Sequence, residues 1–242
     1  MMMRVLRILA ATGVAVALVA GCSGSTTSLP VASSSAATGN TAVGNAAYVA
    51  GSFAPLRAPG TSSSLLTMTV SSSAFTNGGT LPASAPGPAA NGCSTSGTAT
   101  SPALSWTAGP AGTSSYMISM FDTDAPTGIG FMHWVIVDIP ATVTSIPAGY
   151  GTPGAATLGG INGYNDQGFN GYTGPCPPVG DGAHHYWITV SALNTTLAPI
   201  LASVGFTNTA TTTSATLAAI TFFVRQNNAI LAQGQIVGTY GH

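Results

Sequence analysis

The segment Ser115–Gly128 reads SYMISMFDTDAPTG and joins an expected strand to an expected turn. In its first part, from Ser115 to Asp122, every second residue is large and apolar (Tyr116, Ile118 and Met120), which predicts a strand in a sheet. The segment then carries Asp122 and Asp124, whose side chains point to one side because they lie two positions apart. Pro126 follows and ends the strand. The sequence therefore predicts a strand that brings two carboxylates to its C-terminal end.

Four further stretches have the composition of strands. Residues 131–139 are apolar at almost every position, as in a central strand that is buried on both faces. Residues 184–193 are rich in aromatic and β-branched side chains. Shorter stretches lie at Leu66–Val70 and Leu104–Thr107. With 31 glycines and 16 prolines to form turns, the chain is expected to be β-rich.

Helical spacing of apolar residues appears only near the C-terminus. It predicts a helix over Thr213–Arg225 and a second short helix over Ala229–Val237. A Gly-rich segment, about residues 148–183, is expected to be a long loop, and loops of this length in a compact domain usually carry function. The pattern therefore predicts a mainly β domain with a small C-terminal helical element.

The chain is nearly devoid of charge. Of its 242 residues, four are Lys or Arg and five are Asp or Glu, or 4% charged, against about 25% in ordinary soluble domains. Without a basic surface it cannot displace the counterions of nucleic acid, and without any lysine it cannot form a Walker-type phosphate loop. No apolar run reaches the roughly 18 residues that a membrane-spanning helix needs. Nucleic-acid binding is therefore excluded, and the few ionisable groups become informative.

The N-terminus has the features of an export signal. Arg4 and Arg7 precede an apolar run, Ile8–Gly21, that ends directly before Cys22. This arrangement resembles the lipobox of bacterial lipoprotein signal peptides, in which the cysteine is acylated and becomes the new N-terminus. The resemblance implies an extracytoplasmic protein of the bacterial cell envelope, anchored to the membrane through acylated Cys22. Ser23 favours the outer membrane in a Gram-negative cell. The alternative is an ordinary secretory peptide.

Three parts are expected along the chain. Residues 1–21 form the signal peptide. Residues 22–50 are mostly Ser, Thr, Ala, Gly and Asn, which cannot bury enough apolar surface to order themselves, and they predict a flexible tether. Residues 51–242 form the folded domain.

Four motifs occur in a fixed order within this domain. They are FDTDAPTG at residues 121–128, MHWV at 132–135, GYTGPCPP at 171–178 and HHY at 184–186. Together they resemble the phosphatidylethanolamine-binding protein family, in particular its bacterial Raf-kinase-inhibitor-like branch. The resemblance covers residues 64–241.

The resemblance implies a large central sheet packed on a smaller sheet, with a small anion-accepting pocket at one end. One position departs from the family pattern: in the HHY motif, His185 stands where the family has an arginine. By strand alternation His185 points away from the pocket, so the departure puts in doubt only the ion pair that the arginine would make. The pocket residues carried over from the family are Asp122, Asp124, His133, Gly174, Pro175, His184 and Tyr186.

These residue types can hold a phosphate without Lys or Arg. Imidazole and phenol groups donate hydrogen bonds, and backbone N–H groups of a Gly-rich bend can surround oxygen atoms. The carboxylates can accept from the ammonium group of an ethanolamine headgroup. We therefore expect a non-catalytic protein that binds a phosphate-bearing small molecule or a phospholipid headgroup, with an affinity that falls as the histidines lose their protons.

Other readings of the same residues stay open. Taken singly, a histidine is usually a hydrogen-bonded core group and an aspartate before a turn is usually a cap. Two Asp and two His could ligate Zn²⁺ or Mn²⁺, but no HxxxH or Cys/His spacing supports a metal or another cofactor. A hydrolase would need a nucleophile elbow, and no GxSxG occurs, so no catalytic residue is assigned. A protease-inhibitor or other protein-interaction module, using the surface around the pocket, is the main alternative.

The three cysteines fit an oxidising compartment. With Cys22 acylated, Cys93 and Cys176 remain as a pair. A disulfide between them would fix the Gly174–Pro178 bend to the segment before the second strand. Two buried free thiols are the alternative, because sequence does not give the distance between them.

Overall fold

The computed structural model describes residues 66–88, 92–93, 97–155 and 157–242. The expected signal peptide, Cys22, the expected tether and residues 51–65 lie outside the described residues. Within the described ranges, no helix is long and apolar enough to cross a membrane.

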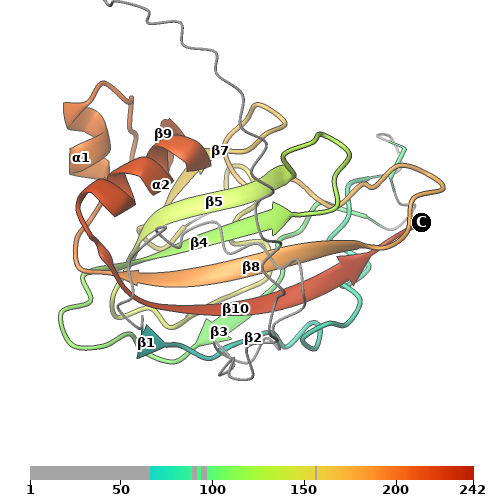
Figure 1. Ribbon diagram of the computed structural model, residues 1–242, viewed down its shortest axis with the longest axis horizontal. Helices are drawn as coiled ribbons and strands as arrows, with labels where there is room; N and C mark the ends of the chain where they lie inside the picture. The colour runs from blue at the N-terminus through green and yellow to red at the C-terminus, as the bar shows by residue number, and fades with distance from the viewer. Residues whose placement is uncertain (1–65, 89–91, 94–96, 156) are drawn as a thin grey trace, which may run out of the picture. The chain divides into compact units, whose positions relative to one another are not determined.

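A seven-stranded sheet forms the centre of the domain (Figure 1). Its four long middle strands are antiparallel, and its two edges are each closed by a short parallel pairing. In spatial order the strands are β1 (Leu66–Thr67), β10 (Ile230–Tyr240), β8 (His184–Leu193), β4 (Ser115–Asp122), β5 (Phe131–Pro140), β7 (Ile161–Tyr164) and β9 (Thr212–Thr216).

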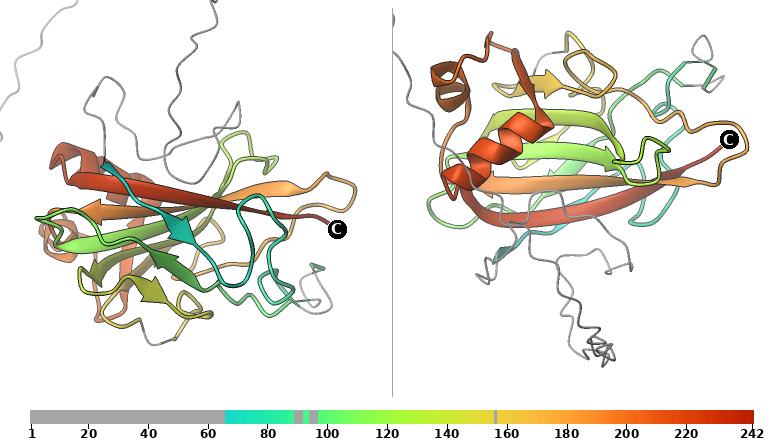
Figure 2. Two further views of the ribbon diagram at one scale, coloured as in Figure 1. Left: turned by 90° about the horizontal axis from the view of Figure 1, so that it is seen from below. Right: turned by 45° about the horizontal axis from the view of Figure 1, so that its top comes forward.

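A smaller antiparallel sheet lies against one face of the large sheet (Figure 2). It consists of β2 (Val70–Ser71), β3 (Leu104–Trp106) and β6 (Ser145–Ile146). The core between the two sheets contains apolar side chains from both, among them Trp106 from β3 and Ile118 from β4. The expected arrangement of a large sheet packed on a smaller one is confirmed.

Two helices cover part of the other face of the large sheet, α1 (Ala198–Ser203) and α2 (Leu217–Gln226). The side chains of Met117 and Val135 point to this face, whereas those of their neighbours Ile118 and Ile136 point to the smaller sheet. This alternation explains why β4 and β5 are apolar on both sides.

Some elements differ from the sequence prediction. Leu66–Val70 is not one strand, because the chain passes from the large sheet to the small one at residues 68–69, where Met68 N–H bonds Gln233 in one sheet and the Thr69 carbonyl accepts from Thr107 in the other. The predicted long loop also contains β7.

The C-terminal elements contain the clearest error. The predicted helix over Ala229–Val237 is wrong, because this segment belongs to β10 and pairs along its length with β8. The helix predicted over Thr213–Arg225 begins only at Leu217, where the side chain of Thr216 caps it by accepting from the Ala219 N–H at 3.4 Å. The β-branched residues before it form β9 instead.

Helix α1 was not predicted, and its N-terminus is held from a distant strand. The carboxylate of Asp138 in β5 accepts hydrogen bonds from the N–H groups of Leu197 at 2.6 Å and Ala198 at 2.8 Å. Burial raises the pKa of Asp138, and the two N–H bonds offset this only in part. Asp138 also has a left-handed backbone with φ of 59°. A cap from another element thus replaces the local capping residue that a sequence pattern would reveal.

Candidate functional site

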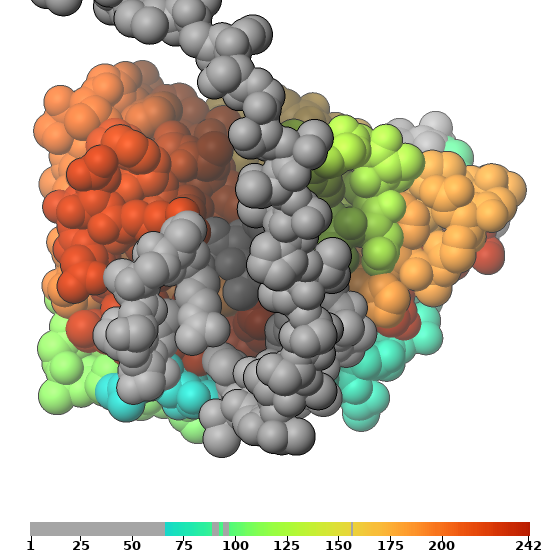
Figure 3. Space-filling view, viewed as in Figure 1, coloured from blue at the N-terminus to red at the C-terminus, as the bar shows by residue number. Residues whose placement is uncertain are grey.

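A cavity of about 410 Å³ lies where β4 ends and β5 and β8 begin. The loop between β4 and β5 and the loop that leads into β8 form its two lips. These loops lie side by side at the end of the domain away from α1 and α2 (Figures 1 and 3). The lining residues are Asp122, Ala125, Pro126, Thr127, Phe131, His133, Asp166, Gln167, Thr173, Gly174, Cys176, Pro177, Pro178 and His184.

Asp122 is the polar centre of the cavity. It is buried, and its Oδ2 lies 2.8 Å from Nδ1 of His184 and 3.9 Å from Nε2 of His133. Its Oδ1 accepts from the N–H of Asp124 at 2.9 Å. Burial alone would raise the pKa of Asp122, but the contacts with His133 and His184 and the Asp124 N–H outweigh burial and lower it. Asp122 is therefore a carboxylate at neutral pH.

Each histidine has one ring nitrogen near Asp122, and a contact at the other ring nitrogen fixes the orientation of the ring. His133 Nδ1 lies 2.9 Å from the Thr173 carbonyl, which can only accept, so this nitrogen carries a proton. His184 lies between two carboxylates, because its Nδ1 contacts Asp122 and its Nε2 lies 3.6 Å from Oδ2 of Asp181. The site thus holds two imidazole rings in fixed directions around one buried negative charge.

Tyr186 lies behind the two histidines. Its ring meets the His133 ring edge-on at a centroid distance of 5.2 Å and stacks on the His184 ring at 6.4 Å. Its hydroxyl is buried and has no hydrogen-bond partner among the described residues. Burial, followed by the charge of Asp122, raises the pKa of Tyr186, so the phenol keeps its proton.

One wall of the cavity is a rigid bend that contains Gly174 and Cys176. A Cβ at Gly174 would lie 2.5 Å from both the Ala85 carbonyl oxygen and the Gly87 nitrogen, so only glycine fits there. Gly87 N–H donates to the Pro175 carbonyl at 3.2 Å. Cys176 forms a disulfide with Cys93, with 5.0 Å between the Cα atoms. The structure thus contains the pairing that the sequence left open.

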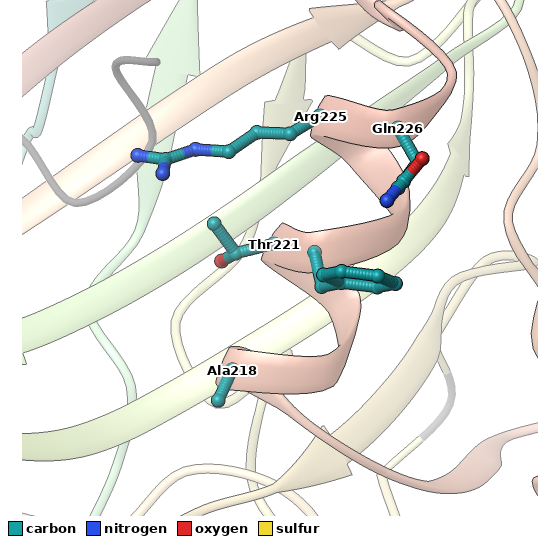
Figure 4. Close-up of a pocket in the computed structure, with 5 residues that line it drawn as sticks. Ala218, Thr221, Arg225 and Gln226 are labelled. Carbon is teal, nitrogen blue, oxygen red and sulfur yellow. The ribbon is translucent and has the colours of Figure 1, made fainter. Parts of the chain in front are cut away.

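A second hollow, of about 490 Å³, lies over the outer side of α2 (Figure 4). It is lined by Ala218, Thr221, Phe222, Arg225 and Gln226, which contribute a single ionisable group. Although it is larger, it lacks the converging polar groups of the first cavity, which is therefore the candidate site. Among the residues that the structure describes, no group of three His, Cys, Asp or Glu side chains could hold a metal ion.

Comparison with known proteins decides the family. The model of the phosphatidylethanolamine-binding protein family matches residues 71–241. The chain belongs to this family. It is similar to the UPF0098 protein YbcL of Escherichia coli, with 47% identity over 103 residues, which span 42% of this chain and 56% of YbcL. The crystal structure of YbcL, described as a member of the mammalian family, superposes with a TM-score of 0.60 at 34% identity, covering 72% of this chain and 98% of that chain.

A mycobacterial relative bears on the N-terminal signal. LppC of Mycobacterium tuberculosis, whose name assigns it provisionally to the lipoproteins, is 38% identical over 91 residues. The alignment covers 37% of this chain and 41% of LppC.

The structure brings together only some of the residues carried over from the phosphatidylethanolamine-binding proteins. Asp122, His133, Gly174 and His184 line the cavity, whereas Pro175 and Tyr186 are not among its lining residues. Asp124 is also absent from the lining.

The departure from the family pattern at His185 explains the placement of Asp124. Oδ2 of Asp124 lies 2.8 Å from Nδ1 of His185 and accepts from the backbone N–H of the same residue at 2.6 Å. Both side chains are partly exposed, at 42% and 46%. His185 points away from the cavity, as alternation along β8 predicts, and it contacts Asp124 where the family places an arginine.

Sequence reasoning missed several polar residues that lie in or beside the cavity. Asp166 accepts from the Met132 N–H at 2.8 Å, and Gln167 accepts from the Thr173 hydroxyl. Asp181 stands beside His184. All of them lie in the segment expected to be one long loop but outside its GYTGPCPP motif, so no pattern distinguished them.

Proposed function

We propose that this chain is a non-catalytic protein of the cell envelope that binds a phosphate-bearing small molecule or phospholipid headgroup in the cavity around Asp122. The observation that carries the proposal is the pair of buried imidazoles fixed around this carboxylate. A volume of about 410 Å³ suits a small ligand. In a chain with 4% charged residues, such a cluster stands out.

The chemistry favours a zwitterion over a bare anion. No Lys or Arg is among the residues that line the cavity in the described part of the chain. Phosphate oxygens would therefore be held by neutral or histidine donors, with His133 and His184 as the candidates among the lining residues. Asp122 and Asp181 would accept from an ammonium group on the same ligand, as in phosphorylethanolamine.

The lining residues also support a non-catalytic role. Among the described residues around the cavity, none is a serine, and the one cysteine is held in a disulfide. The hydroxyl of Thr173 already donates to Gln167. The hydroxyl of Thr127 likewise donates to the Gly130 carbonyl at 2.6 Å, so no described lining Ser, Thr or Cys is free to form an acyl-enzyme with the histidine–aspartate pair.

The proposed location rests on the N-terminal sequence and on one relative. The segment before Cys22 has the order of a lipoprotein signal, and the name of LppC points the same way. We propose export followed by anchoring through acylated Cys22, at the outer membrane in a Gram-negative cell. Two or three acyl chains give a durable anchor, since each buried CH₂ contributes about 0.8 kcal/mol.

Calorimetric titration of the full chain with phosphorylethanolamine tests the binding proposal. His184→Ala should weaken binding about 10- to 100-fold, because a hydrogen bond to a charged group is worth about 1.5–3 kcal/mol. His185→Ala is the matched control, since this neighbouring side chain points away from the cavity and should leave binding unchanged. Equal binding by the parent and His184→Ala would contradict the proposal, as would a loss of equal size in His185→Ala.

A further inference from the structure

Two aliphatic side chains protrude on either side of the cavity mouth. Ile129 is 85% exposed and Val179 is 83% exposed, more than any other large hydrophobic residue that the structure describes. Ile129 belongs to the β4–β5 loop, which forms one lip with Ala125–Thr127. Val179 directly follows Pro177 and Pro178, which form the other lip. Both exposed residues thus belong to the candidate site rather than to unrelated parts of the surface.

Both side chains are held outward by tight turns. Ile129 lies between Gly128 and Gly130, whose positive φ values of 81° and 77° favour glycine. The Thr127 hydroxyl closes this turn by donating to the Gly130 carbonyl at 2.6 Å and accepting from the Ile129 N–H at 3.4 Å. At the other lip the Asp181 N–H donates to the Pro178 carbonyl at 3.1 Å, with Val179 inside the turn. The exposure of these residues is therefore built into the loops.

The two lips project together from one end of the domain. Figure 3 shows the green β4–β5 loop beside the orange loop that leads into β8, and Figure 2 shows the same neighbourhood from other directions. Helices α1 and α2 lie at the opposite end. The two loops that carry the exposed aliphatic residues therefore lie at the same end of the domain, beside the cavity.

We propose that this end of the domain docks on a phospholipid bilayer, with Ile129 and Val179 entering the boundary between headgroups and acyl chains. The cavity mouth would then stand at the level of the headgroups. The inference rests on the proposed function for its choice of a phospholipid as the occupant. It adds the surface and the orientation through which the domain would reach a headgroup that is still in the membrane.

The character of this end favours a lipid surface over a protein partner. Ile129 and Val179 are separate protruding tips on two loops, not one contiguous apolar patch of the kind that protein interfaces bury at their centre. Such apolar tips suit the soft interfacial region, where partial burial of aliphatic groups is favourable. Asp122 and Asp166 line the described cavity, Asp181 stands beside His184, and no Lys or Arg is among the lining residues. This charge disfavours anionic lipids and leaves zwitterionic bilayers as the matching surface.

The predicted anchor would keep the domain within reach of that surface. The predicted tether, residues 22–50, spans 29 positions. A flexible chain of this length averages roughly 27–32 Å from end to end. Tethering over such a distance raises the effective concentration of the bilayer at the cavity mouth, so two shallow insertions suffice to orient the domain.

Tryptophan scanning on vesicles tests the orientation in the full chain. The protein is reconstituted in phosphatidylcholine–phosphatidylethanolamine vesicles whose acyl chains carry bromine, which quenches tryptophan fluorescence at short range. Ile129→Trp and Val179→Trp report on the two tips, and Phe222→Trp on α2, 54% exposed at the other end of the domain, is the matched control. The native Trp106, Trp134 and Trp187 are buried and form a constant background.

We expect the two tip tryptophans to shift to shorter emission wavelengths and to lose most of their added intensity in brominated vesicles. The control tryptophan should keep its emission, and replacing half of the lipid with phosphatidylglycerol should reduce quenching at the tips. Quenching of the tip residues no stronger than that of Phe222→Trp would overturn the inference. Tips that stay in water on vesicles but become protected when soluble envelope proteins are added would also overturn it, in favour of a protein partner.

Phosphorylethanolamine titration of the same tryptophan variants separates this inference from the proposed function. Unchanged binding with no tip quenching would refute bilayer docking and leave the headgroup site standing. Tip quenching without phosphorylethanolamine binding would support docking and refute the headgroup site.

Discussion

Replacing both disulfide cysteines tests how the candidate pocket is held together. In the double variant Cys93→Ala/Cys176→Ala, the bend that forms one wall of the cavity loses its covalent link to the segment that packs behind it. Two hydrogen bonds between these segments remain: the Gly87 N–H donates to the Pro175 carbonyl at 3.2 Å, and the Tyr172 hydroxyl donates to the Ala85 carbonyl at 3.0 Å. We expect both the stability of the domain and the affinity for phosphorylethanolamine to fall.

The size of the stability loss follows from the length of the closed loop. The two cysteines are 83 residues apart, and in the chain-entropy model a loop of this length stabilises the folded state by about 4.5 kcal/mol, because it restricts the unfolded chain. Globular domains are stable by about 5–15 kcal/mol in total. The disulfide is therefore expected to provide a large share of the net stability.

Guanidinium unfolding monitored by tryptophan fluorescence measures this loss. The double variant should unfold at a clearly lower denaturant concentration, and its m-value should rise because the unfolded chain without the cross-link exposes more surface. The parent treated with reductant should move towards the double variant, whereas reductant should leave the double variant itself unchanged. A loss below about 1 kcal/mol would refute the entropic reasoning, since no loop of this length could then be constraining the unfolded state.

Three further variants probe single features. Asp122→Asn should destabilise the fold by about 1–3 kcal/mol at pH 7 and flatten the loss of stability in acid. Folding lowers the pKa of this carboxyl, so the carboxylate stabilises the native state above the pKa of the unfolded chain, near 4, and that contribution is lost as the pH falls through the pKa of the folded state. Unfolding midpoints of both proteins from pH 7 down to pH 2 measure the effect, and parallel curves would contradict the assignment. Gly174→Ala should cost about 1–3 kcal/mol through overpacking, whereas Gly182→Ala, with open space around its added Cβ, should be neutral in the same thermal-melt comparison. Asp138→Ala should cost about 2–4 kcal/mol, because two helix N–H groups lose their acceptor and an alanine must take a left-handed backbone; wild-type stability in chemical denaturation would show that the cap is dispensable.

The long strands could be predicted from sequence because the pattern is determined locally. The bounds of β4 and β8 agree with the prediction to the residue. Both strands alternate or concentrate aromatic and β-branched residues, and both end at clear turn signals. Burial on each face then follows from the two layers that cover the sheet.

The elements that were missed depend on distant parts of the chain. The apolar spacing in Ala229–Val237 is compatible with a helix, but pairing with β8 makes this segment a strand. Gly234 in this strand has no room for a side chain, because an added Cβ would lie 2.2 Å from the Met68 carbonyl oxygen. Helix α1 has only six residues and is capped by Asp138, 59 positions before Leu197. Local propensity cannot detect such partners.

The candidate site was predictable to the extent that its residues lie in strands. Asp122, His133 and His184 come from three adjacent strands and meet as the motif order implies. Asp124 lies beyond the end of β4, where alternation no longer fixes the direction of a side chain, and His185 holds it outward. The contributions of the 148–183 segment depend on loop geometry that no periodicity records.

The position of β10 has a consequence for how the domain folds. Among the described elements it comes last in the sequence, yet it lies between β1 and β8 and pairs in parallel with the first described residues, with Leu66 opposite Ala232. Until β10 is available, β8 has an unpaired edge and the sheet cannot close. Pairing between segments so distant in sequence also slows folding. If the chain is exported as we propose, this strand order would help to keep it unfolded during passage.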